Sequence, residues 1–328
     1  MAEPLVDPHG RTVRDLRISI TDRCNLRCRY CMPAEGLAWL PRPDLLTYEE
    51  IERVARVCVE RFGFTGIRLT GGEPTVRAHL PVLVEKLATL GTDLSMTTNG
   101  ATLRLLAGDL RAAGLRRINI SLDSLRPETF FAITRRHALD QVLDGIDAAV
   151  DAGFSPVKVN CVLIRGVNDD EIVDFARFGR ERGVTIRFIE FMPLDAEEGW
   201  APGTVVPGAE VVDTVAAVYP LAPVDARGSA PAERFRYLDG AGEIGVIASV
   251  TQSFCGSCDR VRLTAEGMFR NCLFSVKETD LRAILRSGGS DDDVAGAIAA
   301  DVGTKWAGHS IGRVDFIRPD RSMSQIGG

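Results

Sequence analysis

The chain has 328 residues, of which 45% are hydrophobic and 26% charged, and its formal net charge is −6. This composition fits two average domains, or one large α/β barrel with an appendage. The negative charge argues against a broad nucleic-acid-binding surface, so an anion site must be built locally from a few arginines. No stretch approaches the ~18 apolar residues of a membrane span, and the first residues are too polar for a signal peptide. We therefore predict a cytoplasmic protein without membrane contact.

Short strands alternate with amphipathic helices from about residue 14 to residue 191. Helices of this length between strands imply parallel strands joined by right-handed crossovers, in an open sheet or a barrel. We predict strands at residues 15–20, 66–70, 93–98, 117–122, 156–164 and 184–190. We predict the main helices at residues 47–62, 79–90, 102–113, 139–152 and 169–182.

The second part of the chain is more irregular. Residues 195–232 are rich in Pro, Gly and Ala without clear periodicity, so we interpret them as a linker or lid. Beyond them we predict strands near 234–238 and 244–250 and helices near 279–287 and 291–306. The predicted organisation is a partial barrel over residues 1–194, the linker over 195–232, and a small C-terminal α+β region over 233–328.

The predicted strands alternate polar and apolar residues, whereas buried parallel strands are usually continuous apolar runs. Side chains two apart share a face of a strand. The polar face contains Asp15, Arg17, Ser19, Arg68, Thr70, Ser95, Thr97, Asn99, Asn119, Ser121, Asp123, Lys158 and Asn160. The apolar face contains Leu16, Ile18, Ile20, Ile67, Leu69, Ile118, Ile120, Leu122, Val157 and Val159. We predict that the apolar face packs on helices and the polar face lines the lumen of an incomplete barrel; a solvated sheet face is the alternative.

Six of the eight cysteines form two triplets, one near each end of the chain. The first triplet is Cys24, Cys28 and Cys31, and the second is Cys255, Cys258 and Cys272. In a cytoplasmic protein such motifs indicate metal binding or catalysis more often than disulfides. Three thiolates suit a [4Fe–4S] cube that keeps one iron open to a small molecule, although a zinc site remains an alternative. The two other cysteines, Cys58 and Cys161, are predicted to fill the core.

Two arginines, Arg260 and Arg262, lie between Cys258 and Cys272 of the second triplet and share a face if the segment is extended. Guanidinium groups beside a metal site suit a polyphosphate, because each can bond it bidentately. The alternative is a structural zinc loop with a histidine as fourth ligand. None of the four histidines, His9, His79, His137 and His309, is near in sequence.

Two loops after predicted strands contain glycine. In LTGGEP (69–74) the glycines let the backbone approach a ligand, and Glu73 can pair with an ammonium group, but a plain turn explains the motif equally well. TTNG (97–100) is foremost a turn signal.

The spacing of the first triplet resembles the radical S-adenosylmethionine (SAM) superfamily, in which the open iron chelates SAM. A longer series of segments resembles one of its families, the GTP 3′,8-cyclases (molybdenum-cofactor biosynthesis protein A). Those segments are ITDRCNLRCRYC, IRLTGGEPTVR, TTNG, INISLDSL, VKVN, IRFIEFMP, FCGSCDRVRLT, NCLFS and the terminal GG. The resemblance runs from about residue 14 to residue 328, and residues 195–240 contribute nothing to it.

This resemblance implies two [4Fe–4S] clusters, one on each cysteine triplet, with SAM on the first and guanine at the open iron of the second. It implies a SAM site lined by Tyr30, Gly72, Ser121 and Met192. It implies a GTP site made of Arg17, Arg68, Thr97, Lys158, Arg260, Val261 and Arg262. Gly327 and Gly328 are implied to enter the lumen and help set the radical step. The alternatives for this tail are a frayed terminus and a conjugation tail like that of sulfur carriers.

The implied reaction is the conversion of GTP to (8S)-3′,8-cyclo-7,8-dihydroguanosine 5′-triphosphate, the first step of molybdenum cofactor biosynthesis. A 5′-deoxyadenosyl radical removes the ribose 3′ hydrogen, C3′ adds to C8 of guanine, and one electron quenches the product radical. The implied partners are an electron donor of the flavodoxin or ferredoxin type and a downstream cyclic pyranopterin monophosphate synthase; a homodimer is left open. The alternatives are a radical SAM enzyme that modifies a peptide and a non-catalytic metal or iron–sulfur carrier.

Overall fold

The computed structural model describes residues 2–194, 199–224, 227–314 and 316–327. They form a twelve-stranded sheet in the order β12-β11-β10-β1-β2-β3-β4-β5-β6-β9-β8-β7. The consecutive parallel strands are β1 (Asp15–Ser19), β2 (Gly66–Thr70), β3 (Asp93–Thr98), β4 (Arg117–Ser121), β5 (Val157–Leu163) and β6 (Thr185–Glu190). The flanking strands are β7 (Leu221–Pro223), β8 (Glu233–Tyr237), β9 (Glu243–Ile247), β10 (Arg260–Leu263), β11 (Met268–Arg270) and β12 (Thr279–Asp280).

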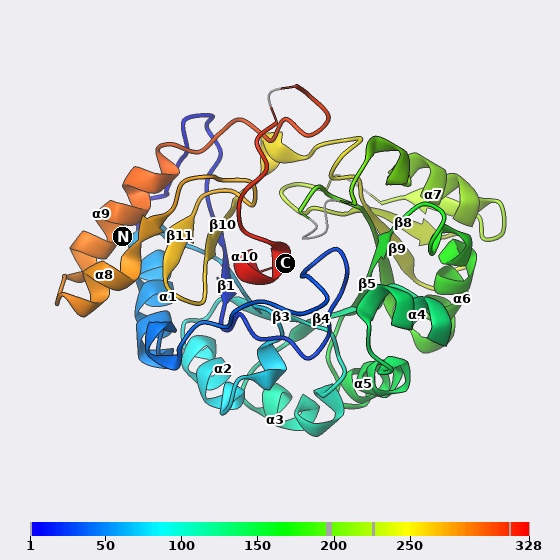
Figure 1. Cartoon of the computed structure of the whole chain (residues 1–328), viewed down its shortest axis with the longest axis horizontal. Coiled ribbons are helices and arrows are strands. Elements are labelled where there is room, and N and C mark those ends of the chain that lie inside the picture. Colours follow the sequence, from blue (N-terminus) through cyan, green and yellow to red (C-terminus); the bar gives the residue numbers. More distant parts are fainter. Residues whose placement is uncertain (1, 195–198, 225–226, 315, 328) are drawn as a thin grey trace.

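Helices cover the outer side of the curved sheet, and a short C-terminal helix lies on its inner side (Figure 1). The α-helices are α1 (Tyr48–Phe62), α2 (Leu80–Ala88), α3 (Ala107–Ala112), α4 (Pro127–Thr134), α5 (Leu139–Asp151), α6 (Ile172–Arg182), α7 (Gly208–Ala216), α8 (Leu281–Arg286), α9 (Asp291–Val302) and α10 (Met323–Ile326). The 3₁₀ helices are η1 (Arg42–Asp44), η2 (Pro74–Val76), η3 (Leu103–Leu105), η4 (Asp169–Glu171), η5 (Pro202–Thr204) and η6 (Cys255–Ser257). Among the described residues, no helix combines the length and apolar character needed to cross a membrane.

The strand–helix alternation predicted from the sequence is confirmed for β1 to β6, each within one residue or so of its expected bounds. Local signals explain the helix ends: at α1, Thr47 and Glu50 form a capping box, and Gly63 ends the helix in the left-handed conformation. Two predicted helices are divided, because η3 precedes α3 and η4 precedes α6. Helix α4 is not predicted by the sequence pattern, since it spans only two turns and is apolar on more than one side.

The segment predicted as an irregular linker contains regular structure. Helix α7 and strand β7 both lie within residues 195–232, and Val211 and Val215 of α7 are buried in the core. The sequence pattern did not predict these two elements, because short apolar turns among Pro, Gly and Ala give too little periodicity. Residues 195–198 and 225–226 lie outside the described residues, and the lid remains a prediction.

The C-terminal region extends both edges of the sheet. Strand β10 pairs in parallel with β1, and β9 pairs in parallel with β6, so residues far apart in sequence continue the same sheet. Antiparallel pairs then join β10 to β11, β11 to β12, β9 to β8 and β8 to β7. The described residues thus form an α/β fold with a mainly parallel sheet and antiparallel strands from the C-terminal region. The domain boundaries placed at residues 194 and 233 remain a prediction.

The two faces of the strands differ as the alternation predicts. Every residue assigned to the apolar face lies in the hydrophobic core between sheet and helices. Cys58 and Cys161 lie in the same core, as predicted for filler residues. The register aligns polar residues across neighbouring strands: Arg262 of β10 is opposite Arg17 of β1, which is opposite Arg68 of β2, which is opposite Ser95 of β3. The inner face is therefore polar and strongly basic at this level of the sheet.

Candidate active site

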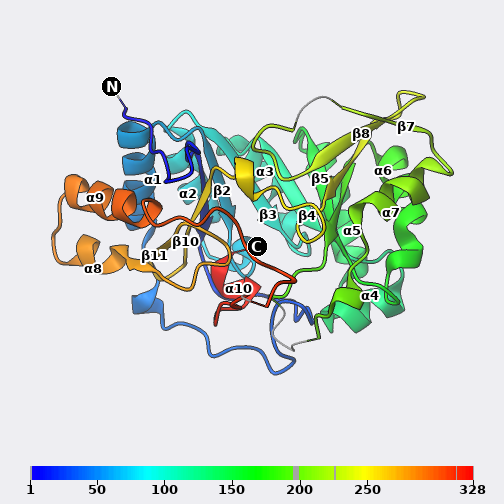
Figure 2. The ribbon, with the colours of Figure 1, turned by 90° about the horizontal axis from the view of Figure 1, so that it is seen from above.

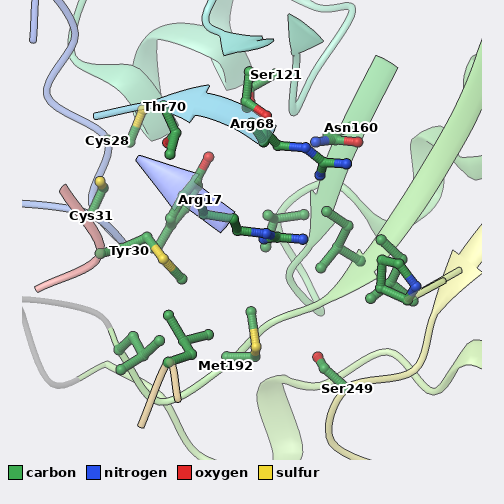
Figure 3. Close-up of a pocket in the computed structure, with 18 of the residues that line it drawn as sticks. Arg17, Cys28, Tyr30, Cys31, Arg68, Thr70, Ser121, Asn160, Met192 and Ser249 are labelled. Carbon is green, nitrogen blue, oxygen red and sulfur yellow. The ribbon is translucent and has the colours of Figure 1, made fainter. Parts of the chain in front are cut away.

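A cavity of about 300 Å³ lies on the inner side of the sheet, and both cysteine triplets line it. Of the residues predicted for the SAM and GTP sites, it is also lined by Tyr30, Gly72, Ser121, Met192, Arg17, Arg68, Thr97, Arg260 and Arg262. Figure 3 shows Arg17 and Arg68 reaching into the same space as Asn160, with Met192 and Ser249 across from them. Tertiary structure thus brings together residues separated by up to about 250 positions in sequence.

A second cavity of about 200 Å³ adjoins the first, because Arg17, Arg68, Arg187 and Arg260 line both. Lys158, predicted for the GTP site, lines this second cavity together with Arg117 and Arg234. The facing acidic groups are Asp15, Asp259 and Glu243. The wall of this second cavity holds seven cationic side chains against three carboxylates, so it favours an anionic ligand.

Val261 is the one described residue of the predicted GTP site whose side chain lies elsewhere. It pairs with Leu16 in the sheet register and is fully buried in the hydrophobic core. Arg260 and Arg262 flank it on the opposite face of β10, because side chains alternate along a strand. The side chain of Val261 therefore supports the strand and is not brought to the cavity.

The loop that carries the first triplet is held by the loop after β2. The backbone N–H groups of Gly72 and Glu73 donate to the carbonyl groups of Thr21 and Arg23, each at 2.7 Å. A Cβ atom on Gly72 would lie 2.4 Å from the carbonyl oxygen of Arg23, which no side chain could tolerate. The sequence suggested that the glycines of LTGGEP let the backbone approach a ligand. In the structure, Gly72 instead allows close approach to the loop that carries the first triplet.

Glu73 is fully buried, and its carboxylate is engaged by the protein. It accepts hydrogen bonds from the backbone N–H and hydroxyl of Thr75, from the hydroxyl of Thr98 and from the backbone N–H of Asn99. Asn99 in turn donates to the side chain of Asn25, next to Cys24. The carboxylate thus joins the β2 and β3 loops around the first triplet, a structural role beside the ammonium pairing that the sequence suggested.

The first triplet lies in an apolar and slightly anionic environment. Burial raises the pKa of Cys24 to about 11 and that of Cys31 to about 12, and it raises the pKa of Cys28 well above its ordinary value. The charges of Glu73 and Asp123 act in the same direction. These thiols are free and stay protonated without a metal, so cluster binding must release protons.

The second triplet has the opposite electrostatic environment. Although burial raises the pKa of Cys255, hydrogen bonds from His309 and Ser253 outweigh it and lower the pKa to about 6. Burial also acts on Cys258, but the charges of Arg260 and Lys305 leave its pKa below the ordinary value. Only Cys272 keeps a raised pKa, mainly because of burial. A thiolate is therefore favoured at Cys255 before any metal binds, and the cations beside Cys258 favour its ionisation.

His309 was missed by sequence reasoning as a neighbour of the second triplet. It is 54 positions from Cys255 in sequence, so spacing gives no signal, yet its side chain hydrogen-bonds that thiol and lines the cavity. With His309 beside Cys255, a zinc site that includes a histidine ligand is an alternative to a cluster. Within the described ranges, however, no three Cys, His, Asp or Glu side chains converge where a single ion could bind. A four-iron cube is larger than one ion and holds its ligands farther apart, so the donor sets fit a cluster better than zinc.

Arg187 and Asp123 also belong to the cavity wall but were not assigned to the site from the sequence. Arg187 of β6 donates to the side chains of Asn160 and Asn119, at 2.9 and 2.7 Å. Asp123 accepts a 2.5 Å hydrogen bond from the hydroxyl of Tyr30, which fixes that ring beside the first triplet. Burial raises the pKa of Asp123 to about 6. The signal for Arg187 was present, because a lone arginine in VTIRFIE interrupts an otherwise apolar strand.

The C-terminal tail runs into the middle of the molecule, where α10 lies inside the curve of the sheet (Figures 1 and 2). Ser324, Ile326 and Gly327 are buried, so the described part of the tail is not a frayed terminus. The carbonyl group of Gly327 accepts a hydrogen bond from Nη1 of Arg262. Gly328 lies outside the described residues, so its predicted role stays a prediction.

Comparison with known proteins agrees with this geometry. Residues 18–179 match the model of the radical SAM superfamily, and residues 184–311 match the model named Molybdenum Cofactor Synthesis C. The chain is 48% identical to GTP 3′,8-cyclase of Streptomyces coelicolor, with 100% of this chain and 97% of that protein covered. It is 50% identical to GTP 3′,8-cyclase of Rhodopirellula baltica, with 100% and 94% covered.

Among solved structures, the fold is similar to that of Streptococcus suis SuiB bound to S-adenosylmethionine, with a TM-score of 0.59 and 14% identity over 88% of this chain and 69% of that chain. At that identity the likeness concerns the fold alone. Identity near one half over the whole of this chain, in contrast, shows the family. The chain belongs to the GTP 3′,8-cyclase family of the radical SAM superfamily.

Proposed function

We propose that this chain is a radical SAM enzyme that converts GTP to (8S)-3′,8-cyclo-7,8-dihydroguanosine 5′-triphosphate in molybdenum cofactor biosynthesis. Family membership supports the reaction, and the cavity supports the substrate. The sheet then acts as an incomplete barrel whose polar lumen holds both SAM and GTP. A cytoplasmic location, a flavodoxin- or ferredoxin-type electron donor and a downstream cyclic pyranopterin monophosphate synthase belong to the same proposal.

The observation that carries the proposal is the crowding of buried arginines in the cavity. Burial lowers the pKa of Arg17 well below its ordinary value, and the charges of Arg68 and Arg262 lower it further. Burial likewise lowers the pKa of Arg187 to about 9, with Arg68 and Arg117 adding to the effect. Nε of Arg17 is buried without a hydrogen-bond partner among the described residues. Buried cations that repel one another are stabilised by a multivalent anion such as a triphosphate.

The positions of these groups suggest an orientation for GTP. The triphosphate lies toward the second cavity, where Lys158, Arg187 and Arg68 meet. The guanine base lies toward Cys255, Cys258 and Cys272, and the ribose lies between the two triplets. In this orientation Arg17 and Arg262 contact the phosphates nearest the ribose. The protein thereby supplies placement and exclusion of water, which can contribute a large share of catalysis when two reactants must be aligned.

The residues of the first triplet fit a [4Fe–4S] cluster with one open iron, and Tyr30, Gly72, Ser121 and Met192 line the adjoining space proposed for SAM. When bound, this cluster supplies the electron that cleaves SAM reductively. The residues of the second triplet fit a second cluster, since two of their thiols have lowered pKa values and two cations lie beside them. Asp123 positions the Tyr30 ring through its hydrogen bond, and Glu73 holds the loop of the first triplet in place.

Anaerobic incubation of the reconstituted chain with GTP, SAM and a strong reductant tests the proposal. We expect 5′-deoxyadenosine and a cyclised nucleotide in equal amounts, and neither product without the reductant. SAM cleavage that leaves GTP unchanged would favour the peptide-modifying alternative. A colourless protein that binds zinc and does not cleave SAM would favour the carrier alternative.

A further inference from the structure

Lys305 is a buried cation between the two loops that carry the second cysteine triplet. Its side chain is only 4% exposed. Its Nζ atom donates to the backbone carbonyl groups of Arg260 and Asn271, each at 2.6 Å. Arg260 lies two positions after Cys258, and Asn271 directly precedes Cys272. One ammonium group therefore ties together the backbone segments on which two of the three cysteines lie.

This ammonium group has no carboxylate partner in the part of the chain that the structure describes. The two acceptors of Lys305 are neutral carbonyl groups. Asp301 of α9 accepts from the hydroxyl of Thr279, and its charge acts on Lys305 through space without a hydrogen bond. Burial lowers the pKa of Lys305, and the groups that raise it most are Cys258 and Cys272 in their ionised forms. An isolated charge is expensive to bury, so a buried ammonium group needs a nearby anion.

A second buried cation at the same loops shows the contrast. Arg11 donates to the carbonyl groups of Cys255 and Ala307, at 2.7 and 2.8 Å, and so also fixes the loop of the triplet. Its charge is compensated by Asp7, whose carboxylate oxygen lies 2.5 Å from Nε of Arg11. Arg11 and Asp7 together thus carry no net charge, whereas Lys305 brings a positive charge without a hydrogen-bonded carboxylate to the triplet.

The first triplet also has a nearby cation, Arg27, which donates to the carbonyl groups of Cys24 and Leu26 at 2.7 and 2.8 Å, but carboxylates outweigh it there. The ionisable groups that act most on Cys24 and Cys28, besides the other cysteines, are Glu73 and Asp123, and both are negative. A [4Fe–4S] cube bound by three cysteine thiolates carries negative charge, and one-electron reduction makes it more negative by one unit. A nearby cation stabilises the reduced form and a nearby anion destabilises it, so the charge around a cluster shifts its reduction potential.

We propose that Lys305 is the charge-compensating and positioning residue of the second cluster, which makes that cluster easier to reduce than it would be without this ammonium group. The proposal rests on the proposed function, because it assumes a cluster on Cys255, Cys258 and Cys272. The cluster supplies the anion that the buried ammonium group lacks, and the ammonium group holds the two cysteine loops at the right separation. The difference in charge between the two triplets then favours an electron on the second cluster, the side on which we place the guanine base.

The test isolates the second cluster in the full-length chain by replacing Cys24, Cys28 and Cys31 with alanine. Redox titration followed by electron paramagnetic resonance then measures the one-electron reduction of this cluster alone. In the Lys305→Met variant we expect the equilibrium constant for reduction to fall at least tenfold, which is 59 mV for a one-electron couple. Lys305→Arg keeps the charge and should stay close to the parent. Lys277→Met makes the same change at an exposed lysine five positions after Cys272 and should leave the potential unchanged.

The possible results distinguish a failure of the second cluster from a failure of the role proposed for Lys305. A parent variant that binds no iron at the second triplet overturns the second cluster itself, and with it the basis for any role of Lys305. A cluster that forms with an unchanged potential in Lys305→Met overturns the role of Lys305 alone. If Lys305→Met folds but loses the cluster while Lys305→Arg keeps it, the charge requirement is confirmed in a stronger form. Loss of the cluster in both variants would mean that geometry and not charge is decisive, which also overturns the proposal.

Discussion

Arg262 donates a hydrogen bond to the backbone carbonyl group of Gly327, and this bond anchors the C-terminal tail inside the curve of the sheet. Arg262 is also one of the cations that we place at the phosphates of GTP. Burial lowers its pKa to about 10, and the charge of Arg260 adds to this effect. The tail and the substrate therefore compete for, or share, the same guanidinium group.

Gly327→Ala should severely reduce formation of the cyclised nucleotide while both clusters and SAM binding stay intact. Gly327 has a φ angle of +82°, and a Cβ atom there would lie 3.0 Å from Cγ2 of Thr70 and 3.3 Å from Cβ of Ser19. Gly288→Ala is the matched control, since Gly288 has the same φ angle but no atom within 4 Å of the added Cβ. Product yield, iron content and SAM affinity measured on both variants separate a local effect at the cavity from general backbone strain.

Deletion of Gly327 and Gly328 together tests the role of the whole tail end. We expect this truncated chain to retain iron and SAM and to lose most of its cyclised product. Turnover equal to that of the wild type would show that the buried tail serves packing only.

The iron content should distinguish the two triplets. We expect about eight iron atoms in the reconstituted chain and about four in Cys24→Ala, which should lose all SAM cleavage. Cys272→Ala should also keep about four, and it should cleave some SAM without forming cyclised nucleotide. Cys58→Ser and Cys161→Ser serve as controls: both residues lie in the apolar core, so iron content should not change even if stability falls. An iron content near one or two in the unmodified chain would contradict the two-cluster assignment.

Arg17→Met should weaken GTP much more than guanosine, because the nucleoside has no phosphate for the guanidinium group to bind. Loss of a charge-assisted hydrogen bond typically costs roughly 1.5–3 kcal/mol, or about tenfold to a hundredfold in affinity. The melting temperature without ligand should not fall and can rise, since the substitution relieves repulsion from Arg68 and Arg262. Calorimetric binding and thermal unfolding measure the two effects. Equal loss of both ligands together with a lower melting temperature would indicate a structural role instead.

Binding of GTP should weaken as the pH rises from 7 to 8.5. Burial lowers the pKa of Lys158 to about 8, and the charges of Arg187, Arg117 and Arg68 act in the same direction. Triphosphate favours the protonated ammonium group, so affinity is full well below pH 8 and declines as the free protein loses this proton around pH 8. For a single group the dissociation constant should rise roughly fourfold across that range. Lys158→Arg stays charged and should flatten the profile, and a wild-type profile without this slope would argue against contact between Lys158 and phosphate.

Much of the architecture could be predicted from the sequence. Local periodicity placed β1 to β6 closely, because the strands alternate and the longer helices between them, such as α1 and α5, are amphipathic over several turns. The same alternation separated Leu16 and Ile18, which pack in the core, from Arg17, which faces the cavity. Cysteine spacing within each triplet is also a local property, and it indicated clusters without any knowledge of the fold.

Contacts between residues that lie far apart in sequence were determined by the tertiary structure alone. The approach of His309 to Cys255, the tie between Lys305 and the loops at Arg260 and Asn271, and the bond between Arg262 and Gly327 leave no periodic signal. Helix α7 was missed for a related reason, since its two apolar turns gain stability from packing on the core and not from strong local preference. A sequence therefore determines which residues can bind metal and phosphate, because chemistry is a property of single side chains. Which of them meet, and with what surrounding charge, is decided when parallel strands join the two ends of the chain in one sheet.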